Sequence, residues 1–313
     1  MPGPIVTGAL VSGGPGVMLG LWVSGGNSMK TFRDRHCFVT GAASGIGRAT
    51  ALALAEQGAW LSLTDIQQEA LAGVADEVRQ RGGRVLASRA LDIADYSAVR
   101  AFADDILREH GSPEVLMNIA GISTWGTIEN LDIEHWRQLV DINLMGPVHV
   151  LQSFVPAMID AGRGGHIVNV SSAAGLFPLP WHAAYSATKF GLRGISEVLR
   201  MDLAHHRIGV SLVCPGAVDT GLVQTVNIVG IDRNDPEVRA LVSRFQRHAV
   251  KPEQAARAIL RGVQRKRFMV FTSADIRLGY WFQRKWAWPF ELVMRLINRQ
   301  AFRLAQQKMT RRS

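Results

Sequence analysis

Residues 36–58 read HCFVTGAASGIGRATALALAEQG, and the fold class can be inferred from this stretch. His36–Thr40 is a short apolar run of the kind that forms a buried strand. A turn with glycines at positions 41, 45 and 47 follows, and Arg48–Gln57 has the pattern of a helix that ends at Gly58. A strand, a glycine turn and a helix in this order indicate the start of an α/β domain.

The same alternation continues along the chain. Further strands are predicted at Trp60–Thr64, Arg84–Ala90, Val115–Asn118, His166–Ser171, Val210–Cys214 and Phe268–Thr272. Further helices are predicted at Gln67–Gln80, Tyr96–His110, Ile133–Ile159, Ala183–Ala204 and Pro252–Gln264. The predicted fold class is therefore α/β, with a Rossmann-type, doubly wound parallel sheet of about seven strands and helices on both faces.

The glycine turn, Thr40–Gly47 (TGAASGIG), has the composition of a dinucleotide-binding turn. Glycines let the backbone approach a pyrophosphate, and the helix N-terminus offers free N–H groups and a positive dipole. The turn follows the first strand and opens a helix, which is the context that this motif requires.

Asp65 ends the second strand, 18 residues after Gly47. A carboxylate at this point accepts hydrogen bonds from the adenosine ribose and repels a 2′-phosphate. Ser44, rather than Arg or Lys, precedes Gly45, so both features favour NAD over NADP. Asp65 also suits the start of the helix at Gln67, and the two roles are compatible.

Tyr185 and Lys189 are four residues apart in a predicted helix, so they share one helical face. A nearby ammonium group favours the phenolate and lowers the pKa of a tyrosine from its usual value of about 10. Such a tyrosine can exchange a proton with an alcohol or carbonyl oxygen near pH 7. Ser172, at the preceding strand end, is placed to hold that oxygen. The spacing alone also fits an ordinary amphipathic helix, so the interpretation depends on the rest of the chain.

These motifs resemble those of the short-chain dehydrogenase/reductase family over about residues 30–275. The family's T-G-x-x-x-G-x-G corresponds to Thr40–Gly47, and its acidic contact to the adenine ring corresponds to Asp92. Its N-N-A-G corresponds to Asn118–Gly121, with Ile119 in place of the second Asn. Its P-G-x-x-x-T segment, which contacts the nicotinamide carboxamide, corresponds to Pro215–Thr220.

The resemblance implies a catalytic set of Asn143, Ser172, Tyr185 and Lys189. Tyr185 would be the base in oxidation and the acid in reduction, while Lys189 lowers its pKa and binds the nicotinamide ribose. Ser172, 13 residues before the tyrosine, would bind the substrate oxygen, since Ser171 is one residue out of register. Asn143 is expected to kink the long helix and to hold a water that relays protons. The implied cofactor-binding residues are Thr40, Gly41, Ser44, Gly45, Ile46, Gly47, Asp65, Asp92, Ile93, Asn118, Ala120, Gly121, Tyr185, Lys189, Pro215, Gly216, Val218 and Thr220.

The composition of the chain argues against several other classes of protein. Of the 313 residues, 47% are hydrophobic and 19% are charged, which is typical of a globular protein. Cys37 and Cys214 lie in apolar runs and no Cys/His cluster has metal-ligand spacing, so we predict neither a disulfide framework nor a metal site. The net charge is +9, but residues 277–313 hold nine Lys or Arg against Glu291 alone. The body of the chain is therefore nearly neutral, which argues against nucleic-acid binding.

We divide the chain into three parts. Residues 1–28 hold eight glycines and no charged side chain. We expect a disordered leader there, the alternatives being a membrane-associated or a packed segment. Residues 29–275 form a single catalytic domain, and residues 276–313 form a basic, amphipathic C-terminal extension.

The extension contains three tryptophans and a helix predicted at Glu291–Gln307. Arg295, Arg299 and Arg303 form one ridge of this helix, and its apolar residues lie on another face. Aromatic rings beside a basic amphipathic helix suit a membrane surface. The alternative is packing over a neighbouring subunit or over the substrate mouth.

Residues 221–250 lie where the family keeps a substrate lid, and they are largely apolar. Phe177, Leu179, Trp181 and Trp125 are further candidates for the pocket wall, or else for the core or a subunit interface. No charged residue is evidently placed to anchor an acid or a phosphate. We therefore expect an apolar secondary alcohol or ketone, such as a steroid, a retinoid or a fatty-type lipid.

The alternative function is a catalytically weak NAD-binding scaffold or sensor at a membrane surface, against which the complete catalytic set argues. The resemblance further implies a homodimer or a homotetramer. The predicted location is the cytoplasm or the cytoplasmic face of a membrane.

Overall fold

The computed structural model describes residue 29 and residues 31–220, 227–230 and 249–309. Its centre is a seven-stranded parallel sheet with the order β3-β2-β1-β4-β6-β7-β9, which confirms the predicted fold class. The order reverses between β1 and β4, as in doubly wound folds. The strands are β1 (His36–Thr40), β2 (Trp60–Asp65), β3 (Arg84–Ala90), β4 (Val115–Asn118), β6 (Gly165–Val170), β7 (Ile208–Cys214) and β9 (Met269–Phe271).

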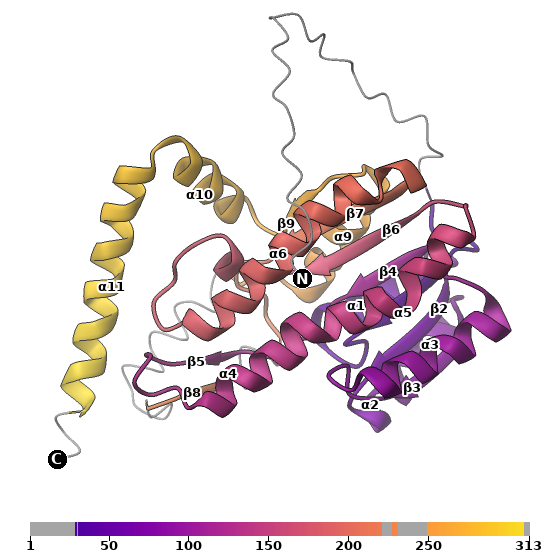
Figure 1. Cartoon of the computed structure of the whole chain (residues 1–313), viewed down its shortest axis with the longest axis horizontal. Coiled ribbons are helices and arrows are strands. Elements are labelled where there is room, and N and C mark those ends of the chain that lie inside the picture. Colours follow the sequence, from indigo (N-terminus) through magenta and orange to yellow (C-terminus); the bar gives the residue numbers. More distant parts are fainter. Residues whose placement is uncertain (1–28, 30, 221–226, 231–248, 310–313) are drawn as a thin grey trace, which may run out of the picture.

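Helices cover both faces of this sheet (Figure 1). One face packs against α1 (Gly45–Ala55), α2 (Gln68–Gln80) and α9 (Pro252–Gln264). The other face packs against α3 (Tyr96–His110), α5 (Gly146–Asp160) and α6 (Ala183–Asp202). Crossover connections of this kind bury both sides of a parallel strand, which explains the continuous apolar runs in the sequence.

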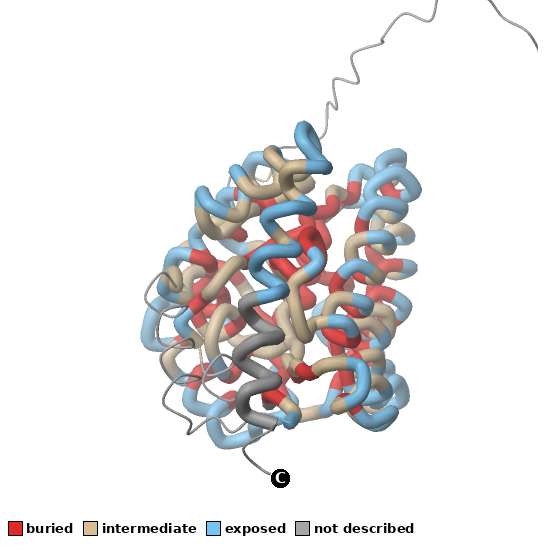
Figure 2. The backbone as a smooth tube through the Cα atoms, turned by 90° about the vertical axis from the view of Figure 1, so that its left-hand side faces the viewer, coloured by how far each residue is buried: buried red, intermediate tan, exposed pale blue. Residues whose placement is uncertain are grey.

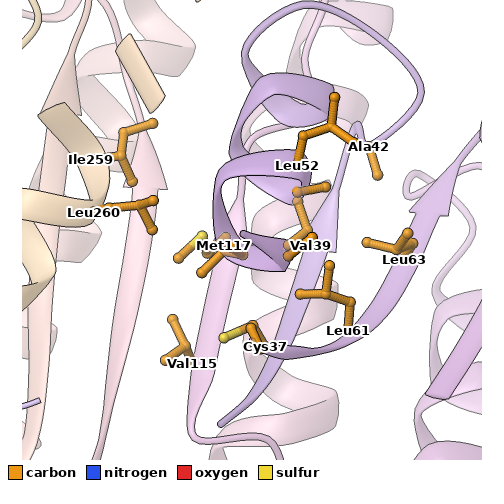
Figure 3. Close-up of a cluster of buried hydrophobic side chains, with 14 of the residues drawn as sticks. Cys37, Val39, Ala42, Leu52, Leu61, Leu63, Val115, Met117, Ile259 and Leu260 are labelled. Carbon is orange, nitrogen blue, oxygen red and sulfur yellow. The ribbon is translucent and has the colours of Figure 1, made fainter. Parts of the chain in front are cut away.

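The first strand shows this two-sided burial. Cys37 and Val39 belong to the cluster beneath α1 and α9, which Figure 3 shows, whereas Phe38 belongs to the cluster on the opposite face. Side chains alternate along a strand, so neighbouring residues reach different layers of the core. Every residue of β1 is buried, and the turn that follows is held between two packed layers.

Three details differ from the sequence-based elements. Helix α1 begins at Gly45 rather than Arg48. A two-stranded parallel sheet of β5 (Thr124–Trp125) and β8 (Asn227–Ile228) was not predicted. The long helix is split into α4 (Ile133–Val140), a π-helical turn at Asp141–Met145, and α5.

The helical run Ile133–Asp160 is long and apolar enough to cross a membrane. Half of its most apolar window is buried inside the protein, so its apolarity belongs to the core. No other helix among the described residues meets both criteria of length and hydropathy.

The C-terminal extension contains two helices, α10 (Ala274–Lys285) and α11 (Ala287–Met309). The predicted helix began at Glu291, so the aromatic stretch before it is also helical. Ile276, Tyr280 and Phe290 pack against a core cluster that contains Phe177. Helix α11 then crosses the face of the domain towards which the strand ends point (Figures 1 and 2). The predicted leader and most of the predicted lid lie outside the described residues.

Candidate active site

A cleft of about 470 Å³ lies at the carboxyl ends of β1, β2, β4, β6 and β7. Ligands of open α/β sheets bind at this edge, where the strand order reverses. The cleft brings together many of the residues predicted from the sequence. They are Gly41, Ser44, Gly45, Ile46, Gly47, Asp65, Asp92, Ile93, Ala120, Gly121, Ser172, Tyr185, Lys189, Pro215, Gly216, Val218 and Thr220.

The glycine positions of the turn have no room for a side chain. A Cβ on Gly47 would lie 1.9 Å from the carbonyl oxygen of Gly41, and a Cβ on Gly41 would lie 2.8 Å from Cα of Ala120. Gly41 and Gly45 also have positive φ angles of 67° and 51°. Ser44 is the N-cap of α1 and makes no side-chain capping bond, and the first turn of this helix has no acidic residue. The free N–H groups and the close backbone approach fit a pyrophosphate.

Asp65 is buried and holds two segments at once. Its Oδ2 accepts a hydrogen bond from the backbone N–H of Ala43 at 3.0 Å, and its Oδ1 accepts one from Gln67 at 3.0 Å. The carboxylate therefore braces the glycine turn and starts α2, while it also lines the cleft. The structural and cofactor-binding interpretations of this residue are compatible in this geometry.

Thr40 and Asn118 lie beneath the cleft rather than on its wall. Thr40 Oγ1 accepts hydrogen bonds from the backbone N–H groups of Ile119 and Ala120, at 3.0 and 3.1 Å. Asn118 Nδ2 donates to Asn169 Oδ1 at 2.9 Å. These two residues position the loop after β4, and they do so through backbone and buried polar contacts.

Asn143 lies fully buried in the π-helical turn that interrupts the long helix. Its Oδ1 accepts from the N–H of Ile122 and its Nδ2 donates to the carbonyl of Ile122, both at 2.9 Å. Insertions of this type often mark functional positions in helices. Both polar atoms of the Asn143 side chain are bonded to Ile122 in the loop after β4. The predicted water would therefore have to bind at another group of this turn.

Ser172, Tyr185 and Lys189 line one part of the cleft. Tyr185 and Lys189 are both buried on α6, and Lys189 Nζ donates to the carbonyl of Val170 at 3.1 Å. Ser171 Oγ donates instead to the backbone carbonyl of Lys189 at 2.9 Å, whereas Ser172 hydrogen-bonds with Tyr185. Ser172 is thus the serine that faces the tyrosine, which agrees with the sequence register.

The ionisation of this pair differs from the sequence-based expectation. Burial raises the pKa of Tyr185 to about 12, and a hydrogen bond with Ser172 opposes that shift. Burial lowers the pKa of Lys189 to about 8. Lys189 Nζ lies 5.6 Å from the centroid of the Tyr185 ring. Burial, which disfavours the charged form of each group, therefore sets the direction of both pKa shifts.

Sequence reasoning missed two features of the site. Asn169 Nδ2 donates to Ser196 Oγ at 2.9 Å, which extends the buried polar chain from Asn118 to α6. His182 lies with its ring centroid 4.4 Å from that of Trp125 and 6.1 Å from that of Tyr185. Burial lowers its pKa from 6.5, so this histidine is neutral beside the tyrosine at pH 7. The sequence indicates these two features only by a polar residue inside a strand, Asn169, and by a histidine shortly before the tyrosine, His182.

None of the four residues predicted for the pocket wall lines the cleft formed by the described residues; they are Trp125, Phe177, Leu179 and Trp181. Leu179 and Trp181 line a second, neighbouring cavity instead. Phe177 is buried and its ring packs 5.6 Å from that of Phe290 on α11. Apolar residues of the cleft itself are Ile66, Leu91, Ile93, Ile119, Ile122, Ile142, Val170 and Val218. No group of three or more His, Cys, Asp or Glu among the described residues is placed to hold a metal ion.

Two proteins of Mycobacterium tuberculosis are similar in sequence to this chain. The chain is 33% identical over 251 residues to the protein named oxidoreductase SadH of Mycobacterium tuberculosis, covering 80% of this chain and 90% of SadH. It is 35% identical over 240 residues to the protein named oxidoreductase EphD of the same species, covering 75% of this chain. The chain spans 40% of the length of EphD.

A solved structure shares the architecture. The short chain dehydrogenase/reductase from Burkholderia phymatum in complex with NAD superposes with a TM-score of 0.74 at 28% identity, over 81% of this chain and 94% of that one. The sequence profile described as short chain dehydrogenase matches residues 35–229. With the glycine turn, the buried tyrosine and lysine and the sheet order all in place, the chain belongs to the short chain dehydrogenase family.

Proposed function

We propose that this protein is an oxidoreductase that transfers a hydride between NAD(H) and an apolar secondary alcohol or ketone. The observation that carries the proposal is the cleft in which Ser172, Tyr185 and Lys189 share one cavity with the glycine turn. A nicotinamide cofactor, when bound, supplies the hydride acceptor or donor. The turn at Gly41–Gly47, Asp65 and the segment Pro215–Thr220 would hold it.

The chain's own residues handle the proton. Tyr185 takes the hydroxyl proton of an alcohol during oxidation and returns it to the carbonyl oxygen during reduction. Ser172 holds that oxygen and its hydrogen bond opposes the rise in the pKa of Tyr185, and Lys189 would bind the nicotinamide ribose. Asn143 holds the loop after β4 through its two hydrogen bonds to Ile122. Gly121 of that loop fits between Asn143 and Lys189, since a Cβ there would lie 2.8 Å from Asn143 Oδ1 and 3.4 Å from Lys189 Nζ. The test is NADH formation from a panel of apolar secondary alcohols, and no turnover would favour the scaffold or sensor.

The cofactor preference depends on Asp65. We expect wild-type kcat/KM to be at least about tenfold higher with NAD than with NADP, because a 2′-phosphate would meet this carboxylate. Asp65→Asn removes the charge and keeps one acceptor oxygen, so it should narrow the difference. Asp65→Ala should narrow it as well, but with a larger rise in KM for both cofactors because the N–H of Ala43 loses its partner. Equal kcat/KM for NAD and NADP in the wild type would refute the assignment.

We also propose that the extension binds anionic membranes, which would bring the protein to apolar substrates. Trp281, Trp286 and Trp288 are 49%, 49% and 75% exposed, although Tyr280 and Phe290 are packed on the domain. Exposed aromatic rings with basic neighbours suit the headgroup region. The exposed tryptophans therefore support binding to a membrane, whereas Tyr280 and Phe290 support packing of the extension on the domain.

Co-sedimentation with anionic and neutral vesicles measures this association. Replacing Trp281, Trp286 and Trp288 by Ser should abolish most binding to anionic vesicles and leave NAD binding unchanged. This triple variant is a better test than truncation at Asp275, which would also remove the packed side chains. Binding that is equal for wild type and variant, or absent from both, would reject the membrane role. Sedimentation velocity of the wild type tests the proposed dimer or tetramer, for which Val198 and Met201 offer exposed apolar surface on α6.

A further inference from the structure

A larger cavity, of about 890 Å³, lies next to the cofactor cleft along α6. Tyr185 and Lys189 line the cleft, whereas Ser186, Phe190 and Arg193 of the same helix line this cavity. Its other walls come from residues 126–129, from Leu176 and residues 178–181, and from the helices α10 and α11. The extension thus forms one wall of this cavity, and the volume is in the range of ligand-binding cavities.

Two guanidinium groups converge on one oxygen in this cavity. Arg193 Nη2 donates to Tyr280 Oη at 3.2 Å, and Arg284 Nη1 donates to the same oxygen at 3.3 Å. The two nitrogens therefore lie within about 6.5 Å of each other, where like charges repel. Arg193 pairs with Glu197 at 2.8 Å. In the described part of the chain no carboxylate pairs with Arg284, and Glu129 is the single acidic residue on the cavity wall.

Several polar atoms beside the cavity lack a partner. Thr127 Oγ1, Trp181 Nε1 and Ser186 Oγ are buried without a hydrogen bond to any described residue, and all three residues line this cavity. Trp181 also has a φ of 64°, in the left-handed region that a bulky residue rarely adopts. Unsatisfied polar groups and backbone strain tend to collect at binding sites.

We propose that this cavity binds an anionic amphiphile, with its carboxylate or phosphate group on Arg193 and Arg284 and its apolar part along Leu176, Leu179 and Phe190. An anion between the two guanidinium groups accepts charge-assisted hydrogen bonds from both, and for Arg284 it supplies a negative partner that no described carboxylate provides. The two arginines are 91 residues apart, so their meeting at Tyr280 could not be predicted from the sequence. The inference does not depend on the proposed reaction, since binding is measured without cofactor or turnover.

Isothermal titration calorimetry with the full-length protein tests this site. The probes are decanoate, decyl phosphate, 1-decanol and inorganic phosphate, each below its aggregation or solubility limit. Decanoate or decyl phosphate should bind at least about tenfold more tightly than 1-decanol and inorganic phosphate, and the comparison of the two identifies the head group. Arg284→Gln should remove this advantage and leave the affinity for 1-decanol unchanged.

Arg299→Gln is the matched control, because Arg299 is exposed on α11 and does not line the cavity. It should bind all probes as the wild type does. Tyr280→Phe, which removes the oxygen that holds both guanidinium groups, should weaken binding of the anionic probes several-fold. Equal affinity of the wild type for the anionic probes and 1-decanol, no effect of Arg284→Gln, or an equal loss in Arg299→Gln would overturn the proposal. Binding of inorganic phosphate as tightly as decyl phosphate would do the same.

Discussion

Tyr185→Phe is expected to lower kcat by roughly 10²- to 10⁴-fold, because general acid–base catalysis contributes about that much and the phenyl ring cannot carry the proton. The dissociation constant for NAD should change little, since the ring and its packing beside His182 are retained. Stopped-flow absorbance at the NADH band measures turnover, and calorimetry measures cofactor binding.

Tyr96→Phe is the control for this substitution. Tyr96 is 45% exposed on α3 and lies outside the cleft, so the same chemical change there should leave kcat unaltered. Retention of more than a few per cent of wild-type activity in Tyr185→Phe would rule out this tyrosine as the acid and base. The protein would then need another proton carrier near Ser172.

The second large effect is expected at the glycine turn. Gly47→Ala places a Cβ 1.9 Å from the carbonyl oxygen of Gly41, and this backbone atom cannot move without displacing the turn. We expect a loss of roughly 2–3 kcal/mol in unfolding free energy, typical of overpacking in a closely packed site. NAD affinity should fall at least about tenfold, because the displaced turn no longer offers its N–H groups to the pyrophosphate.

Gly194→Ala provides the matched comparison. Gly194 is exposed in the interior of α6, and a Cβ added there would meet no other part of the described protein within 4 Å. Alanine there should raise the unfolding free energy by about 0.5–1 kcal/mol through helix propensity, with no change in NAD binding. Chemical denaturation and calorimetry compare the two variants. Identical stability and affinity in both would show that the turn is not tightly constrained.

The order of elements could be predicted from local patterns. Buried parallel strands are continuous apolar runs, and glycines that are required by close backbone contacts are visible as glycines. For the same reason Asp65, Ser172, Tyr185 and Lys189 could be selected from motif and spacing. They follow strand ends or share one helical face, and the sheet edge collects them into one cleft.

Other features depend on contacts between distant segments. The family resemblance led us to expect a kink at Asn143, but not its π-helical form, which is stabilised by both backbone groups of Ile122, 21 residues away. The pKa of Tyr185 is set by burial under layers from several elements, so the expected lowering by Lys189 did not follow from their spacing. The pair β5 and β8 joins residues 103 apart in sequence.

The parallel α/β fold, the glycine turn and the residues at the strand ends therefore follow from the sequence alone, because each of these depends on local backbone and side-chain chemistry. The way in which α10 and α11 lie across the domain emerges only in the folded chain, where their apolar residues either pack or stay exposed. Folding also brings Arg193 to Arg284 around Tyr280. These outcomes depend on which surfaces meet, and the packing of two helices against a remote segment is not encoded in the periodicity of either.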